Sequence, residues 1–175
     1  AFDAQITDKS EAVVLLALQG SKSKEILSGM AGGELCIEPA KNALATVDLS
    51  GKTVHIANTG YTGEPGGEVY VPNDAAVSLW QTLLEKGQDL GVGPIGLGAR
   101  DSLRLEMKYC LYGNDIDETT TPLEAGLAWT VKFDKGDFVG RDAMLRQKDA
   151  GVPRHLVAFT VDGKGIPRHE YKIFS

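Results

Sequence analysis

The chain has 175 residues, a net charge of −6 and 42% hydrophobic residues, a composition typical of a folded protein large enough to bury a core. Glycine supplies 21 residues without a strict period, which predicts many turns and excludes a collagen-like fibre. The acidic balance and the absence of a Lys/Arg cluster exclude a nucleic-acid partner, because neutralising phosphates requires a concentrated basic face. No apolar run approaches the ~18 residues of a membrane-spanning helix, so no membrane is expected as a partner.

The chain begins with a β-rich pattern. Residues 13–19 form an apolar run typical of a buried strand, and Ser21 is placed to cap a short helix that follows. Residues 43–49 and 52–58 flank Ser50-Gly51, a two-residue turn signal. This arrangement predicts a hairpin.

A short strand followed by an amphipathic helix is expected next. Residues 68–72 form the strand, Asn73 or Asp74 caps the helix, and Gly87 ends it. The apolar face of this helix is expected to consist of Val77, Trp80, Leu83 and Leu84. On this interpretation Trp80 belongs to the core.

Residues 97–108 have the propensity of another helix. Within it Asp101 and Arg104 are three residues apart, which predicts a surface ion pair. Arg100 lies in the first turn, where a cation is unfavourable against the helix dipole. An acidic partner, either Glu68 or a ligand anion, is therefore expected beside Arg100.

The last third of the chain adds one helix and two strands to the prediction. Residues 130–133 and 155–161 alternate like strands, and residues 142–151 read as a helix. The strands come in hairpins and do not alternate with helices in a βαβ rhythm. The fold class is therefore α+β, with antiparallel sheets and flanking helices.

The segment 58–72 is the most informative part of the sequence. It combines four glycines, at positions 60, 63, 66 and 67, with Tyr61, Glu64 and Glu68. Glycines allow the backbone to approach a ligand closely, and a ring beside carboxylates suits a planar polar molecule. The alternative is a wide hairpin loop whose glycines only turn the chain and whose glutamates face water.

Together with the segment 97–117, which contains Ala-Arg-Asp-Ser-Leu-Arg-Leu-Glu and Leu-Tyr-Gly-Asn-Asp-Ile, this loop resembles the glycine-cleavage T-proteins, which are tetrahydrofolate-dependent aminomethyltransferases. Weaker matches follow the family's order at residues 17–20, 121–127 and 138–141. The chain departs from the family's usual wording at Ser21, Asn58, Pro65 and Gly67.

The resemblance implies a reaction and a site. T-proteins move the methylene of a lipoyl-bound aminomethyl group to tetrahydrofolate, the acceptor substrate, and release ammonia; the lipoylated H-protein is the carrier. The folate-contacting Glu and Arg of the family match Glu68 and Arg100, and Tyr61, Tyr109 and Tyr112 are candidates to stack on or hydrogen-bond the folate. The family's catalytic Asp lies before Ala1, so no catalytic residue is expected in this chain.

The resemblance also implies an organisation. Residues 1–98 correspond to part of a first folate-binding α+β subdomain, residues 99–150 to part of a second, and residues 151–175 to the start of a truncated C-terminal β domain. The N-terminal part of the folate-binding domain and most of the C-terminal β-barrel are expected to be missing, and the chain by itself is expected to be inactive. Cytoplasm, or the mitochondrial matrix in a eukaryote, is the expected location.

Three alternatives remain at this stage. The iron–sulfur branch of the superfamily carries Lys-Gly-Cys-Tyr-x-Gly-Gln, but residues 135–141 contain no thiol. The folate domain of a sarcosine or dimethylglycine dehydrogenase, or a related demethylase, is the second, and a folded fragment without tight binding is the third. Cys36 and Cys110 stand far apart outside any Cys-x-x-Cys pattern and read as reduced thiols, so no metal site is expected.

Overall fold

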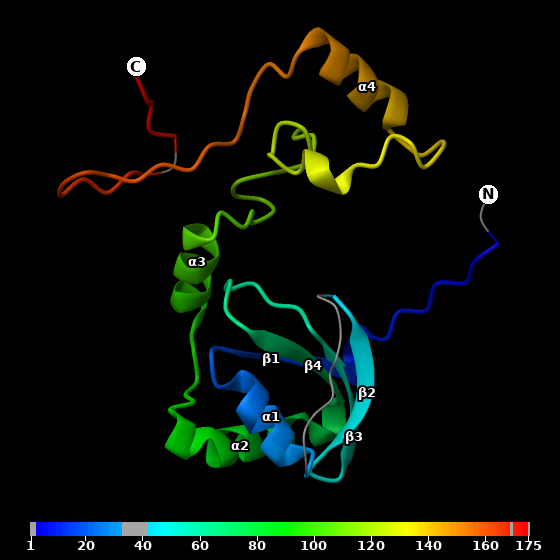
Figure 1. Ribbon diagram of the computed structural model, residues 1–175, viewed down its shortest axis with the longest axis vertical. Helices are drawn as coiled ribbons and strands as arrows, with labels where there is room; N and C mark the ends of the chain where they lie inside the picture. The colour runs from blue at the N-terminus through cyan, green and yellow to red at the C-terminus, as the bar shows by residue number, and fades with distance from the viewer. Residues whose placement is uncertain (1–2, 33–41, 169, 175) are drawn as a thin grey trace. The chain divides into compact units, whose positions relative to one another are not determined.

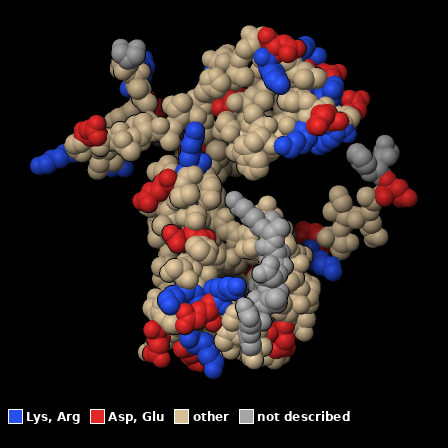
Figure 2. Space-filling view, in the orientation of Figure 1, with Lys and Arg blue, Asp and Glu red and all other residues tan. Residues whose placement is uncertain are grey.

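The computed structural model describes residues 3–32, 42–168 and 170–174 and divides into two compact units, residues 1–109 and 110–175 (Figure 1). In Figure 2, acidic and basic side chains are interspersed over the visible surface of each unit. Within the described ranges, no helix is long and apolar enough to cross a membrane. Cys110 is half-buried, and Cys36 lies outside the described residues.

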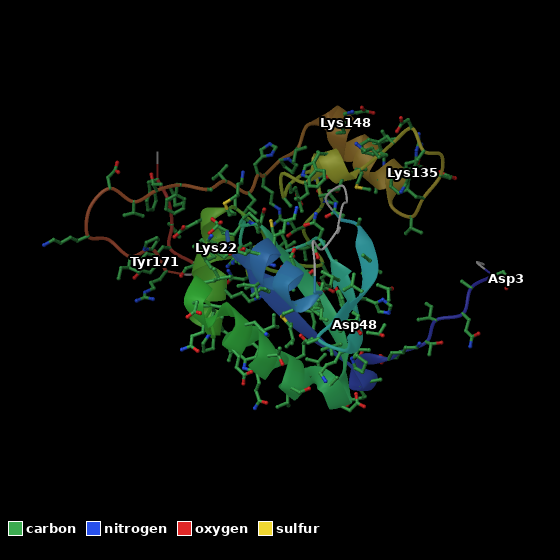
Figure 3. The ribbon with its side chains drawn as sticks, turned by 60° about the horizontal axis from the view of Figure 1, so that its bottom comes forward. Asp3, Lys22, Asp48, Lys135, Lys148 and Tyr171 are labelled. Carbon is green, nitrogen blue, oxygen red and sulfur yellow. The ribbon has the colours of Figure 1, made fainter. Side chains whose placement is uncertain are left out.

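The first unit is built on an antiparallel sheet with the strand order β1-β4-β3-β2. Its strands are β1 (Val13–Gln19), β2 (Leu44–Leu49), β3 (Lys52–Ala57) and β4 (Gly66–Pro72). At the β2–β3 turn Ser50 and Gly51 have φ values of 53° and 81°, the positive angles that a tight two-residue hairpin turn requires. Asp48, labelled in Figure 3, accepts a hydrogen bond from the Gly51 N–H at 2.7 Å. The expected hairpin is confirmed.

Two helices, α1 (Ser23–Met30) and α2 (Asn73–Gly87), pack on one face of this sheet (Figure 1). The core between the layers consists of Leu18, Ile26, Leu27, Met30, Leu49, Val54, Ile56, Val69, Val71, Ala76, Leu79 and Leu83. On the opposite face of β1, Val13 and Leu15 are 39% and 45% exposed. The strand expected at residues 13–19 is therefore confirmed, but it is buried on one face only.

The buried face of α2 agrees with the expected one at Leu83 and differs from it at Val77, which is 69% exposed, and at Trp80. Leu79 is fully buried, whereas Trp80 is 40% exposed, so the placement of Trp80 in the core is wrong. Apolar residues occur at adjacent positions along this helix, and a shift of one residue turns the buried face by about 100°. Small Ala76 lies in the buried row and lets the helix approach the sheet closely. Periodicity does not choose between the two faces.

The expected helix caps are also wrong. The N-cap position of α1 is Lys22 instead of Ser21, and that of α2 is Pro72 instead of Asn73 or Asp74. Neither N-cap makes a side-chain hydrogen bond. β4 runs directly into α2, so Asn73 is already helical, and its side chain donates to the Glu11 carbonyl at 3.4 Å.

The helix expected at residues 97–108 is confirmed as α3 (Leu97–Glu106). In the second unit α4 (Arg141–Ala150) confirms the helix expected there. The strands expected at residues 130–133 and 155–161 are wrong, because neither segment pairs with a strand in the described part of the chain. An alternating pattern needs a partner strand before it forms a sheet.

Aromatic and basic side chains organise the second unit. Phe133 and Phe138 lie with ring centroids 6.4 Å apart. The amino group of Lys135 lies 4.5 Å from the Phe138 ring and that of Lys148 from α4 lies 5.4 Å from the Phe133 ring, and both lysines are labelled in Figure 3. The Lys148–Phe133 contact connects α4 to the preceding loop, and the Lys135–Phe138 contact lies within that loop.

Candidate functional site

Glu68 lies in β4 on the face of the sheet away from α1 and α2. Its neighbours Gly67 and Val69 point into the core, and Glu68 alternates with them and is half-buried. Its cross-strand partners are Ala17 of β1 and Ala57 of β3, whose small side chains leave the carboxylate room on this face. The Thr59 hydroxyl donates a hydrogen bond to Oε2. Glu68 is therefore an oriented acceptor between two small residues.

Gln19, at the end of β1, holds the glycine loop. Its Nε2 donates to the carbonyls of Leu18 (3.2 Å), Thr59 (3.3 Å) and Gly67 (3.5 Å). Its Oε1 accepts from the Thr62 hydroxyl at 3.1 Å. The sequence-based interpretation did not assign Gln19 this role, although the residue belongs to a segment that matches the family.

The loop glycines face protein atoms. A Cβ at Gly60 would lie 1.9 Å from Gln19 Oε1, and one at Gly63 would lie 2.5 Å from the Met107 side chain. A Cβ at Gly66 would lie 2.4 Å from the Leu18 carbonyl. A side chain at position 66 would meet backbone, whereas one at position 60 or 63 would have to displace a side chain of the protein.

Tyr61, Arg100 and Tyr109 form one cluster. The Arg100 guanidinium carbon lies 4.8 Å from the centroid of the Tyr61 ring. The Tyr61 ring also stacks with the Tyr109 ring, at a centroid distance of 5.8 Å and an interplanar angle of 22°. No carboxylate among the described residues pairs with Arg100, so the expected pairing with Glu68 is not observed. The aromatic face of Tyr61 is the partner of the cation in the first turn of α3.

A cavity of about 360 Å³ lies beside this cluster, within the usual size range of small-molecule sites. Polar side chains of Gln19, Thr62, Glu64 and Arg100 line it. Its apolar wall includes Leu18, Val92, Ile95 and Leu103. Glu64 is exposed, so the cavity carries both an acidic and a basic group at its polar side.

Arg104 is not the surface residue that its sequence context indicates. Its side chain is 3% exposed, and its Nε and Nη2 lie 2.8 Å and 2.7 Å from Asp101 Oδ1. Its Nη1 donates to the Tyr109 carbonyl at 3.1 Å, and the Tyr109 N–H donates to the Arg104 carbonyl at 2.8 Å. The predicted Asp101 contact is present, but its description as a surface pair is wrong. Arg104 fixes the backbone of Tyr109, which stacks with Tyr61.

Tyr112 lies in the second unit. Its backbone forms an isolated bridge with Ile116, and its side chain is 69% exposed. Of the five candidates, the structure therefore places Arg100 and Tyr109 in contact with Tyr61 and gives Glu68 a separate place on the sheet.

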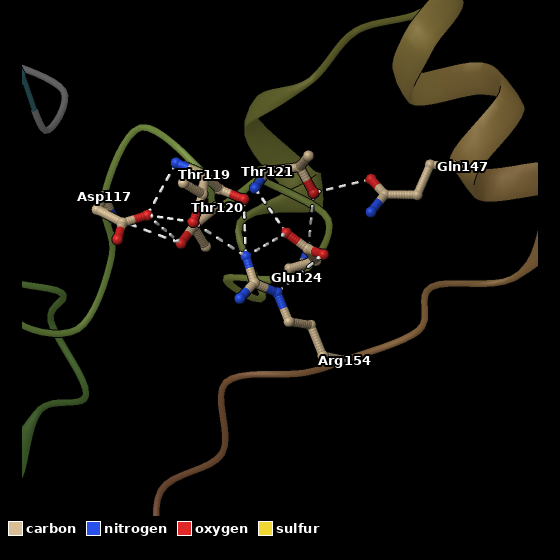
Figure 4. Close-up of polar contacts among 7 residues, drawn as sticks. All are labelled: Asp117, Thr119, Thr120, Thr121, Glu124, Gln147 and Arg154. Atoms are coloured by element: carbon tan, nitrogen blue, oxygen red, sulfur yellow. Dashed lines mark hydrogen bonds and ion pairs between the residues drawn. The ribbon is translucent and has the colours of Figure 1, made fainter. Parts of the chain in front are cut away.

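The second unit contains a polar cluster that the sequence-based interpretation did not identify (Figure 4). Glu124 is 7% exposed; it accepts from the Thr121 N–H at 2.9 Å and from Arg154 Nε at 3.1 Å. Arg154 Nη2 also donates to the Thr119 carbonyl at 2.7 Å. The spacing of Thr121 and Glu124 is that of a capping box, which was the available signal.

These contacts shift the ionisation of the cluster. Hydrogen bonds from Thr121 and Arg154 hold the pKa of Glu124 below its ordinary value. Hydrogen bonds from Thr119 and Thr120 lower the pKa of Asp117, and the Glu124 carboxylate raises that of Arg154. Both carboxyl groups are therefore held in the charged form.

Comparison with known proteins agrees with this fold. Residues 1–135 match the model of the GCVT N-terminal domain family. An aminomethyltransferase of Halothermothrix orenii is 54% identical over 169 residues, which cover 97% of this chain and 47% of the relative. One from Bdellovibrio bacteriovorus is 46% identical over 173 residues, covering 98% of this chain and 48% of the relative.

A solved structure is also similar. The glycine cleavage system aminomethyltransferase T from Bartonella henselae superposes with a TM-score of 0.64 and 39% identity, over 79% of this chain and 37% of that one. The fold is thus that of a GCVT N-terminal domain, α+β with an antiparallel sheet and flanking helices. The chain belongs to the aminomethyltransferase family of the glycine-cleavage T-proteins. It spans about half the length of the relatives that it matches.

Proposed function

We propose that this chain is the tetrahydrofolate-binding part of an aminomethyltransferase of the glycine cleavage system. The protein moves the methylene of a lipoyl-bound aminomethyl group to tetrahydrofolate and releases ammonia. The observation that carries the proposal is Glu68, a half-buried carboxylate oriented by Thr59 between Ala17 and Ala57, in a chain of this family.

The residues present fit a pterin. A pterin presents a 2-amino group beside a ring N–H, and one carboxylate accepts from both. The Thr59 hydroxyl occupies one acceptor position on Glu68, which leaves the remaining lone pairs available. Glu68 thus holds the pterin ring, and Thr59 holds Glu68.

Arg100 and the tyrosines complete the proposed site. Arg100 donates its planar fork to the pterin oxygen or to the glutamate tail of the folate. Its contact with the Tyr61 ring orients the guanidinium. Tyr109 stacks on the Tyr61 ring and supports it.

The contribution of these residues is orientation. Bound tetrahydrofolate supplies a nucleophilic nitrogen, N5, so holding it beside the methylene accounts for much of the rate enhancement. The partner that delivers the methylene is the lipoylated H-protein. The relatives named above are bacterial, and we place the protein in a bacterial cytoplasm.

Glu68→Gln tests the proposal. The amide keeps the shape but turns one donor toward the donor edge of the pterin, and we expect a loss of roughly 1.5 to 3 kcal/mol in tetrahydrofolate binding. Calorimetric titration of the full-length protein measures it, with Glu85→Gln on the exposed side of α2 as the control. Unchanged affinity in Glu68→Gln would remove this residue from the site. Folate-dependent turnover of sarcosine or dimethylglycine, without turnover of the lipoyl carrier, would favour the dehydrogenase or demethylase alternative.

A further inference from the structure

We infer that Gln19 is a positioning residue of the proposed folate site, whose carboxamide fixes the glycine loop and thereby orients Glu68. The inference rests on the proposed function, because the group that it positions is the proposed pterin acceptor. The hydrogen bonds of the Gln19 carboxamide join it to the loop and to the neighbouring Leu18 carbonyl of β1, and none joins it to Glu68.

The first observation is that one side chain bonds both ends and the middle of the loop. Gln19 Nε2 donates to the carbonyls of Thr59 and Gly67, at the beginning and end of the loop, and Oε1 accepts from Thr62 between them. These bonds span 40 to 48 positions of sequence. Because Gln19 is half-buried, loss of the carboxamide leaves these loop groups without their partner.

The second observation is that the loop is shaped around this carboxamide. A Cβ at Gly60 would lie 1.9 Å from Gln19 Oε1 and 2.9 Å from Nε2. The backbone of Gly60 does not have a positive φ, so alanine is permitted there by conformation. The three atoms nearest to such a Cβ all belong to the Gln19 side chain.

The third observation connects the carboxamide to the acceptor. Thr59 receives the Gln19 hydrogen bond at its carbonyl and gives its hydroxyl to Glu68 Oε2. Gly67, which receives the other bond, directly precedes Glu68 in β4. Gln19 therefore fixes both the residue that bonds the carboxylate and the residue that precedes Glu68 in the strand.

A double-mutant cycle with Glu68 tests the inference in the full-length protein. Gln19→Ala should weaken tetrahydrofolate binding about 5- to 10-fold, the equivalent of roughly one hydrogen bond, with the folded state checked by circular dichroism and melting temperature. Because Gln19 acts through Glu68, Gln19→Ala should cause no further loss in the Glu68→Gln background. Gln81→Ala, a glutamine exposed on α2, should bind as the wild type does. Independent, multiplying losses in the double variant would overturn the positioning role.

The glycines supply a second cycle. Gly60→Ala should displace the carboxamide and weaken binding as much as Gln19→Ala, and combining the two should add nothing. Gly66→Ala should add its own loss even with Gln19→Ala, because its Cβ also meets the Leu18 backbone carbonyl at 2.4 Å. Additive effects of Gly60→Ala and Gln19→Ala would contradict the shaping of the loop by Gln19.

Hydrogen exchange separates this inference from the proposed function. In Gln19→Ala the amides of residues 59–67 should exchange faster by about 5- to 10-fold, in keeping with one lost hydrogen bond, whether or not folate is present. If the wild type binds no tetrahydrofolate, the proposed function fails and with it the role toward folate. Unchanged exchange of these amides in Gln19→Ala would show that the Gln19 carboxamide does not fix the loop.

Discussion

Arg100 and Arg104 lie one helical turn apart in α3 but have different surroundings. Arg100 is exposed and lies over the Tyr61 ring, whereas Arg104 is buried and bonded to Asp101 and the Tyr109 carbonyl. The same substitution should therefore affect binding at one position and stability at the other. A planar guanidinium makes both sets of contacts, and lysine reproduces neither geometry.

Arg100→Lys should impair tetrahydrofolate binding with little change in melting temperature, because an exposed cation–π contact contributes only about 0.5 to 1 kcal/mol to stability. Arg104→Lys should instead lower the free energy of unfolding by roughly 1 to 3 kcal/mol, since a buried carbonyl and a carboxylate lose donors. Thermal melting and folate titration of both variants measure the contrast, with Arg146→Lys, exposed in α4, as the control. Equal loss of melting temperature in both variants would show that Arg100 is structural.

The sequence names candidate residues but does not predict their environments. Glu68 and Arg100 are candidates because they match the family's motif, and Tyr61 because it lies in the glycine-rich segment. The role of Gln19 depends on the pairing of β1 with β4, which sets Gln19 opposite Gly66. The burial of Arg104 depends on the path of the chain at Tyr109. No local sequence pattern indicates either contact.

The same distinction holds for whole elements. The helices and the β2–β3 hairpin follow from local propensity and turn chemistry, so they are predicted correctly. The buried face of α2 and the fate of the alternating segments at residues 130–133 and 155–161 depend on partners elsewhere. The face of α2 has a direct energetic test.

Leu79→Ala should cost about 2 to 5 kcal/mol of unfolding free energy, because it opens a cavity in the core between α2 and the sheet. Trp80→Ala should cost clearly less, although the residue is larger, since its side chain is 40% exposed. Urea unfolding of the two variants provides the comparison. A greater loss for Trp80→Ala would restore the face that the sequence favoured.

The Glu124–Arg154 cluster predicts a pH dependence in the second unit. The pKa of Glu124 is lowered in the folded state, first by the Thr121 N–H and then by Arg154. Its stabilising contribution is therefore complete above the ordinary glutamate pKa of about 4.3 and is lost as the pH falls below that value through the lowered pKa. The Leu156 N–H donates to the Glu124 carbonyl at 2.8 Å, so exchange of this amide reports the loss of that contribution.

Protection of the Leu156 amide, corrected for the intrinsic exchange rate, should be constant from pH 7 to about 5 and fall at lower pH. Glu124→Gln should lower this protection at neutral pH. In this variant the protection should also fall less on acidification. Asp117, whose pKa is also lowered, retains its own dependence in that variant. Protection that rises on acidification would give the linkage the opposite sign and contradict the role of the cluster.

At the scale of the whole molecule, the hydrophobic core is distributed unevenly. The core cluster extends from Leu18 to Leu83, within the first unit. In the second unit, the described buried residues are Leu123, Glu124 and Ala125, one of them charged. Because burial of apolar surface provides most of the folding free energy, the two units should differ in local stability.

Native-state hydrogen exchange should therefore show two levels of protection. Amides of β3, β4 and the buried side of α2 should open only with global unfolding of the first unit, because each is bonded inside the sheet or helix that covers the core. Amides of residues 110–175 should exchange through smaller openings, with the strongest protection near Glu124 and Leu156, where side-chain and backbone bonds coincide. Mass spectrometry of exchanged peptides at increasing urea resolves the two levels. Equal protection and an equal urea dependence in both units would mean that the second unit unfolds together with the core of the first, and that its stability does not follow from its own buried surface.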